Sequence, residues 1–99
     1  LTPNALDTMT LFVNKSDVEV IQLAFSSNEK WLAVAYENEM VVFYDCSDLE
    51  NIIRAKEINI YSKAISMEFT SDSSLILLGT ETEGCLVVNI TEGKTITTI

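Results

Sequence analysis

The chain has 99 residues, a length that allows one small domain at most. Fifteen Asp and Glu residues against six Lys and Arg give a net charge of −9, which argues against binding to a nucleic-acid backbone, because that binding needs a basic surface. The chain has no histidine, so serine–histidine triads, cysteine–histidine pairs and histidine-bearing zinc sites are excluded.

The composition is that of a folded domain. A hydrophobic content of 47%, with three Gly and one Pro, excludes a disordered chain. No apolar run reaches the roughly 18 residues of a membrane span, and no signal peptide is visible. Cys46 and Cys85 occur without other marks of secretion, so we interpret both as reduced thiols of a cytoplasmic protein. A nuclear location and a disulfide between the two cysteines are the alternatives.

The first predicted elements are three strands. Residues 21–26 alternate between apolar and polar or small side chains, which is the period of a strand. Two almost wholly apolar runs follow at residues 31–36 and 40–44, and runs of this length are typical of strands buried on both faces. The polar segments between the three strands have the composition of turns.

The same order of patterns recurs further along the chain. Residues 65–70 alternate, and apolar runs follow at residues 75–80 and 85–90. A shift of 44 residues (65 − 21) superposes identical side chains: Ile21 on Ile65, Phe25 on Phe69, Ser27 on Ser71, Glu37 on Glu81 and Glu39 on Glu83. Counting Gly84 as an inserted residue raises the shift to 45 (87 − 42) and superposes Val42 on Val87. We therefore predict two copies of one structural unit.

A fourth strand completes each unit, at residues 51–58 and 95–99, and residues 8–13 are predicted to be the last strand of a preceding unit. Residues 47–57 also fit a helix, because four of their side chains fall at helical spacing: Leu49, Ile52, Ile53 and Lys56. The β-branched content and the repeat favour a turn followed by a strand.

Four strands in about 44 residues resemble a blade of a β-propeller, and specifically a WD repeat, whose period is about 40–45 residues. The segments that carry the resemblance are Leu23-Ala24-Phe25-Ser26, Lys30-Trp31-Leu32-Ala33-Val34-Ala35, Met67-Glu68-Phe69-Thr70, Leu78-Gly79-Thr80 and Glu83-Gly84. Tyr44-Asp45 stands where the family has its Trp-Asp pair, and Asn89-Ile90 stands there in the second unit. Asn38 and Glu83 fall near the family's turn Asp. Without a histidine for the family's polar network, the blades are expected to depend more on apolar packing.

The resemblance implies an all-β fold of two four-stranded antiparallel WD-repeat blades, plus an outer strand of a preceding blade. The expected boundaries are residues 1–14 for the end of the preceding blade, 15–58 for the first blade and 59–99 for the second. Because closed propellers have about four to eight blades, we interpret the chain as a piece of a larger protein. The alternative is that several copies assemble into one ring.

Two classes of connection lie on one rim of a propeller: those that precede the first strand and those between the second and third strands. This rule gathers acidic residues on one rim, offset in part by Lys15 and Lys63: Asp17, Glu19, Glu37, Glu39, Glu81 and Glu83. Such a rim attracts a basic peptide or the basic surface of another protein, chiefly by raising the association rate. The alternative is that these acids are solvated turn residues of an acidic protein.

The aromatic side chains are divided between the rim and the interior. Tyr36 lies beside the acidic residues and is the candidate aromatic contact for a partner, with packing in the core or between blades as the alternative. Trp31 and Tyr44 are expected to be structural, and Asp45 is expected to stabilise its own turn through backbone N–H groups.

The resemblance and the lack of catalytic residues predict a non-enzymatic scaffold that binds other proteins in a multiprotein complex. The predicted protein-binding residues are Glu19, Tyr36, Glu37, Glu39, Glu81 and Glu83. We predict no cofactor and no metal, because Glu37 and Glu39 lack the Asp-rich loop with Gly of calcium sites. The alternative function is a structural element whose exposed strands, at residues 8–13 and 95–99, pair with another chain or copy.

Overall fold

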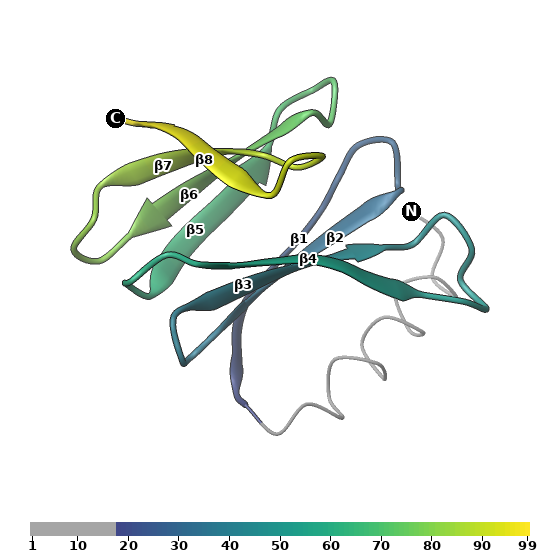
Figure 1. The fold of residues 1–99 in the computed structure, drawn as a ribbon, viewed down its shortest axis with the longest axis horizontal. Helices are drawn as coiled ribbons and strands as arrows, with labels where there is room; N and C mark the ends of the chain where they lie inside the picture. Colours follow the sequence, from purple (N-terminus) through teal and green to yellow (C-terminus); the bar gives the residue numbers. More distant parts are fainter. Residues whose placement is uncertain (1–17) are drawn as a thin grey trace.

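The computed structural model describes residues 18–99, and this part of the chain is all-β. Two four-stranded antiparallel sheets lie against each other, and in each sheet the strands follow chain order (Figure 1). The first sheet contains β1 (Val20–Phe25), β2 (Trp31–Tyr36), β3 (Met40–Asp45) and β4 (Ile53–Asn59). The second contains β5 (Ala64–Phe69), β6 (Leu75–Thr80), β7 (Cys85–Asn89) and β8 (Lys94–Thr98).

The eight strands confirm the predicted strand pattern over the described part of the chain. β4 runs antiparallel to β3 from Met40↔Asn59 to Asp45↔Ile53, so residues 53–59 form a strand and the helical alternative is wrong. No helix that could span a membrane occurs among residues 18–99. The strand predicted at residues 8–13 and the unit predicted at residues 1–14 lie outside the described residues.

The strand pairing shows that the two sheets are copies of one unit. A bulge interrupts the β1–β2 ladder between Val20 and Gln22, and a bulge interrupts the β5–β6 ladder between Ala64 and Ser66. Each residue of the second bulge lies 44 positions after its counterpart (64 − 20 and 66 − 22). Equivalent irregularities at equivalent positions indicate that both sequences specify one backbone path.

The register corrects the predicted insertion at Gly84. Val34 pairs with Val42 in the first sheet, and Leu78 pairs with Leu86 in the second, so the shift is still 44 (86 − 42) in the third strand. Val42 therefore corresponds to Leu86 rather than to Val87. For the same reason Tyr44-Asp45 corresponds to Val88-Asn89 rather than to Asn89-Ile90, because Leu32 pairs with Tyr44 and its counterpart pairs with Val88. Sequence identity favoured Val on Val, but pairing across the sheet decides the register.

The turns β1–β2 and β5–β6 also share one conformation. In the first turn the Ser26 hydroxyl donates to Asn28 Oδ1 (2.6 Å), and in the second the Thr70 hydroxyl donates to Asp72 Oδ1 (2.7 Å). The same Oδ1 atoms accept the backbone N–H two residues further on, at 3.0 and 3.1 Å. A short polar side chain thus closes each turn in place of a backbone group. The next residue in each turn has a left-handed φ: Glu29 (61°) and Ser73 (62°).

One face of the first sheet packs against one face of the second, and their side chains form the main core. We call the first sheet's packed side face A and its opposite side face B, and the same names apply to equivalent positions of the second sheet. Face A of the first sheet contributes Ala33, Ala35, Val41 and Phe43 to the core. Face B of the second sheet contributes Ile76, Leu78, Leu86 and Val88, with Ile90 just beyond β7. All of these side chains are buried, and Phe43 of the first sheet is the largest of them.

Each sheet has a second face that does not take part in the main core. Face B of the first sheet forms a second buried cluster: Leu32, Val34, Tyr36, Val42, Tyr44 and Cys46. Face A of the second sheet carries apolar side chains that belong to neither buried cluster: Leu75, Leu77, Cys85 and Val87. The first three are half-buried and Val87 is buried. These residues stand 44 positions after Trp31, Ala33, Val41 and Phe43, which in the first sheet pack in the core. The second sheet therefore presents the counterpart of a face that the first sheet buries.

The equivalent turns give a prediction about acid stability. Hydrogen bonds from the Thr70 hydroxyl and from Ser74 lower the pKa of Asp72 from 3.8 to about 2. A carboxyl group whose pKa is lower in the folded state stabilises the fold above its unfolded pKa, and that contribution is lost as the pH falls towards the folded pKa. We expect Asp72→Asn, which copies Asn28, to fold at pH 7 and to lose less stability than the parent chain between pH 4 and pH 2.

The reciprocal variant is the matched control. Asn28→Asp introduces a carboxylate into the equivalent turn and should steepen the loss of stability over the same pH range. Urea unfolding at a series of pH values measures both variants, and unchanged pH profiles would contradict the equivalence of the two turns.

Candidate functional site

Five of the predicted rim acids lie at one end of the two sheets, which we call the acidic end: Glu19, Glu37, Glu39, Glu81 and Glu83. All five are exposed. The turn between β2 and β3 and the turn between β6 and β7 bring them together with the segments that precede β1 and β5. The Glu37 amide donates to the Glu19 carbonyl (2.9 Å), and the Glu81 amide donates to the Lys63 carbonyl (3.1 Å). Asp17 and Lys15, which were predicted for the same rim, lie outside the described residues.

Lys63 lies among these carboxylates and joins the two sheets. Its Nζ is 2.5 Å from Oε1 of Glu37, and both side chains are about half exposed. The hydrogen bond and the charge of Glu37 raise the pKa of Lys63, with smaller contributions from Glu81 and Glu39. Among the described residues of this end, five carboxylates and one ammonium give a charge of −4 (−5 + 1). Because the pair is exposed to water, it contributes little to the stability of the fold.

Side-chain hydroxyls hold the turn between β6 and β7 in place. Thr80 Oγ1 donates to the Gly84 carbonyl (2.7 Å) and accepts from the Glu83 amide (2.9 Å). The Thr82 amide donates to the hydroxyl of Ser62, a buried residue of the link between β4 and β5 (3.0 Å). The carboxylates of this turn therefore project from a fixed backbone.

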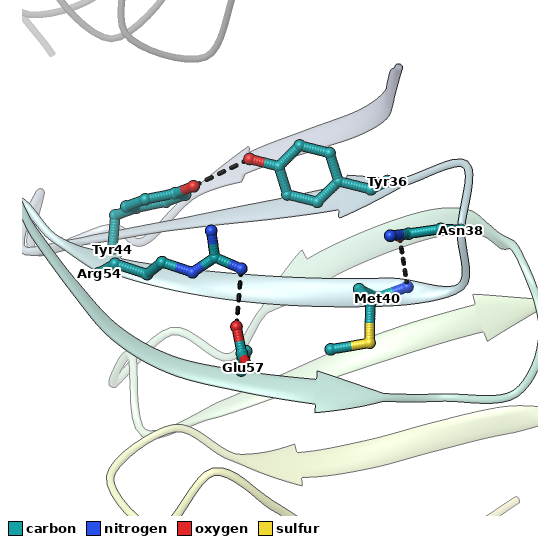
Figure 2. A network of polar contacts seen from close by, with 6 residues as sticks. All are labelled: Tyr36, Asn38, Met40, Tyr44, Arg54 and Glu57. Atoms are coloured by element: carbon teal, nitrogen blue, oxygen red, sulfur yellow. Dashed lines mark hydrogen bonds and ion pairs between the residues drawn. The ribbon is translucent and has the colours of Figure 1, made fainter. Parts of the chain in front are cut away.

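The turn between β2 and β3 is closed differently. The Met40 amide donates to Asn38 Oδ1 (3.3 Å), as Figure 2 shows, and the Ile60 amide donates to the Glu39 carbonyl (3.0 Å). Glu39 has a left-handed φ of 70°, which a residue other than Gly adopts only where the surrounding bonds require it. These bonds fix the direction in which the turn between β2 and β3 projects from the first sheet.

The structure corrects the prediction that Tyr36 contacts a partner. Tyr36 is only 5% exposed, and its hydroxyl is 2.8 Å from that of Tyr44 (Figure 2). Alternation along β2 places Tyr36 on face B with Leu32 and Val34, away from solvent. Burial, followed by the bond to Tyr36, raises the pKa of Tyr44 above its usual range. The structural roles predicted for Tyr44 and Trp31 are confirmed, because Tyr44 is 4% exposed and Trp31 packs against the main core.

The exposed aromatic side chain at the acidic end is Tyr61, which the sequence analysis missed. Tyr61 lies in the link between β4 and β5, is 70% exposed and has a left-handed φ of 56°. Together with Glu83, Leu86 and Thr98 it lines a pocket of about 290 Å³. The available signal was an aromatic residue in a short polar link, outside any alternating pattern. An aromatic ring beside a carboxylate and an apolar floor can hold a side chain that is both apolar and cationic.

The remaining reactive side chains have structural surroundings. Cys46 and Cys85 are both thiols, as predicted. Burial and the charge of Asp45 raise the pKa of the Cys46 thiol to about 11, so this sulfur is protonated at neutral pH. Asp45 Oδ1 accepts the Ser47 amide (2.9 Å), which confirms its predicted role in the turn and lowers the pKa of Asp45. Residues 18–99 contain no group of three or more Cys, Asp or Glu side chains placed to hold a metal ion.

Comparison of the sequence with models of known protein families finds no match, and comparison with curated proteins finds no relative. The relation of the chain to the WD-repeat family is accordingly a proposal.

The buried tyrosine pair gives a second prediction. Tyr44→Phe leaves the Tyr36 hydroxyl buried without its partner, and we expect the free energy of unfolding to fall by about 1–3 kcal/mol. Replacing both tyrosines by Phe removes the two hydroxyls together, so the double variant should lose less stability than the sum of the single losses. Urea unfolding of the three variants measures the coupling, and additive losses would show that the two hydroxyls do not interact.

Proposed function

We propose that the two sheets are consecutive blades of a β-propeller of the WD-repeat type, and that this platform is a non-enzymatic scaffold that binds other proteins. The observation that carries the proposal is the equivalence of the packed faces. Face A of one unit packs on face B of the next, and the second unit has its own face A for a further unit. Units stacked in this head-to-tail manner form a closed ring when the rotation between them is suitable.

Face A of the second sheet supports this proposal, because it carries apolar side chains that a neighbouring unit would cover. Ile65 at its edge is 58% exposed, whereas its counterpart Ile21 is packed against the core. Leu75, Leu77 and Cys85 on the same face are partly exposed, and apolar side chains that gather on one exposed face favour protein contact. Repeat units bury such faces only by stacking, so a partner unit on face A of the second sheet is the arrangement that the repeat favours.

The acidic end supports a binding role for the platform. Its net charge speeds the approach of a basic segment, and the pocket beside Tyr61 offers that segment an apolar contact. Without histidine, the chain lacks the side chain most used for proton transfer near neutral pH. The partner that fits these residues is a protein segment with basic and aliphatic side chains, bound in the cytoplasm or nucleus without a cofactor.

The test uses two fluorescent peptides of equal length, one of Lys and Leu and the other of Glu and Leu. The 99-residue chain should bind the basic peptide, with an association rate that falls as salt is added. Replacing Glu19, Glu37, Glu39, Glu81 and Glu83 by Lys should reduce the affinity by at least about tenfold.

The matched control places the same change in charge elsewhere on the surface, by replacing five other exposed acids with Lys: Glu29, Asp48, Glu50, Glu68 and Glu92. This control variant should keep most of the affinity. Equal losses in the two variants would mean that net charge alone attracts the peptide, which would overturn the assignment of the acidic end.

A further inference from the structure

The outermost strands of the two sheets, β4 and β8, present different edges. β4 carries three charged side chains, Arg54, Lys56 and Glu57, and Arg54 is 2.6 Å from Glu57 (Figure 2). Charges on an edge strand oppose pairing with another chain. The sequence of β8 is Lys94-Thr95-Ile96-Thr97-Thr98, and all five residues are exposed. Both strands carry a bulge, at Ala55 in β4 and at Ile96 in β8. Beyond Lys94 the edge of β8 is uncharged and rich in β-branched residues, so it lacks the charges that protect β4.

The end of β8 that follows its bulge at Ile96 is oriented for pairing on its outer side. Ile99 and Cys85 exchange both of their N–H···O=C bonds, at 2.7 and 3.3 Å. In an antiparallel ladder the residue next to such a pair turns its N–H and C=O away from the paired strand. Thr98 therefore directs its backbone donor and acceptor away from β7, where another strand can meet them.

We propose that β8 pairs antiparallel with β8 of a second copy of this chain, so that the two β5–β8 sheets become one continuous sheet. The contact is two-fold symmetric, because each copy contributes the same strand. It places threonine and isoleucine side chains opposite their own kind, and such cross-strand pairs stabilise a sheet. This inference does not rest on the scaffold function proposed above.

Charge complementarity favours a second copy as the occupant. Antiparallel pairing puts Lys94 of the second copy beside residues 98–99 of the first. Residue 99 lies against the turn between β6 and β7, since a Cβ on Gly84 would be 3.1 Å from the Ile99 carbonyl oxygen. Glu83 precedes Gly84 in that turn, so the lysine of the second copy approaches a carboxylate. Symmetry repeats this approach at the other end of the contact, which gives two Lys94–Glu83 pairs.

The experiment measures the mass of the 99-residue chain against concentration by sedimentation equilibrium. We expect a monomer–dimer equilibrium. Ile96→Lys should raise the dissociation constant at least tenfold, because it places charge on the pairing edge. Ile53→Lys is the matched control, since Ile53 is 50% exposed on β4 and Ile96 is 52% exposed on β8. The control should leave the constant unchanged, and circular dichroism confirms that both variants keep the β-sheet.

A charge exchange tests the orientation of the two strands. Lys94→Glu and Glu83→Lys should each weaken the dimer, and the chain that carries both changes should recover affinity. A double variant as weak as the sum of the single effects would overturn the antiparallel arrangement.

Other outcomes would overturn the pairing itself. A chain that stays monomeric up to millimolar concentration does not pair through β8. The same conclusion follows if Ile96→Lys and Ile53→Lys raise the dissociation constant of the dimer equally. Loss of the dimer on Leu77→Lys but not on Ile96→Lys would show that face A of the second sheet is the contact instead. Glu83 belongs to both proposed contacts, whereas Ile96 does not line the pocket at the acidic end. Peptide binding by Ile96→Lys therefore separates failure of this inference from failure of the scaffold function.

Discussion

The packing of face A of the first sheet against face B of the second is the interaction on which the rest of the structure depends. A four-stranded sheet cannot bury both of its apolar faces alone, so each unit needs a neighbour to form a core. On the first sheet, the small side chains of Ala33 and Ala35 on β2 lie beside the large side chain of Phe43 on β3. The second sheet supplies larger aliphatic side chains to the same core. Burial of these side chains in one shared core holds the two sheets together.

Polar contacts at both ends of the sheets fix how the two units sit against each other. At one end the Ser27 hydroxyl donates to the carbonyl of Ser71, its own counterpart in the repeat, at 2.8 Å. The same hydroxyl is 3.0 Å from that of Ser73. At the other end Lys63 joins Glu37 across the sheets. Among the described residues, serine hydroxyls, the Gln22 side-chain amide, which donates to the Ile65 carbonyl (3.2 Å), and the Lys63–Glu37 pair thus connect the units. The acidic end and Tyr61 take their positions from that arrangement.

The sequence predicted the strands well because apolar runs and turn residues are local signals. It failed where pairing across the sheet decides the outcome. Val42 was aligned with Val87 because the two residues are identical, but the strand pairing shows that Leu86 is the counterpart of Val42. Tyr36 was assigned to the rim because it ends a strand. Its side chain points to the same face of β2 as those of Leu32 and Val34, and that face is buried. The equivalence of the faces was hidden, because Ala33 and Phe43 correspond to Leu77 and Val87, which share only apolar character. Tyr61 lies in a link, where no periodicity constrains the side chain.

Amide hydrogen exchange on a core variant tests the packing of the two sheets most directly. Phe43→Leu removes bulk from face A of the first sheet and changes no residue of the second. If the sheets share one core, protection from exchange should fall for the amides of β6 and β7 as well as for those of β2 and β3, because one cooperative unit opens. If protection falls only in the first sheet, the two sheets open independently and the shared core described here is contradicted.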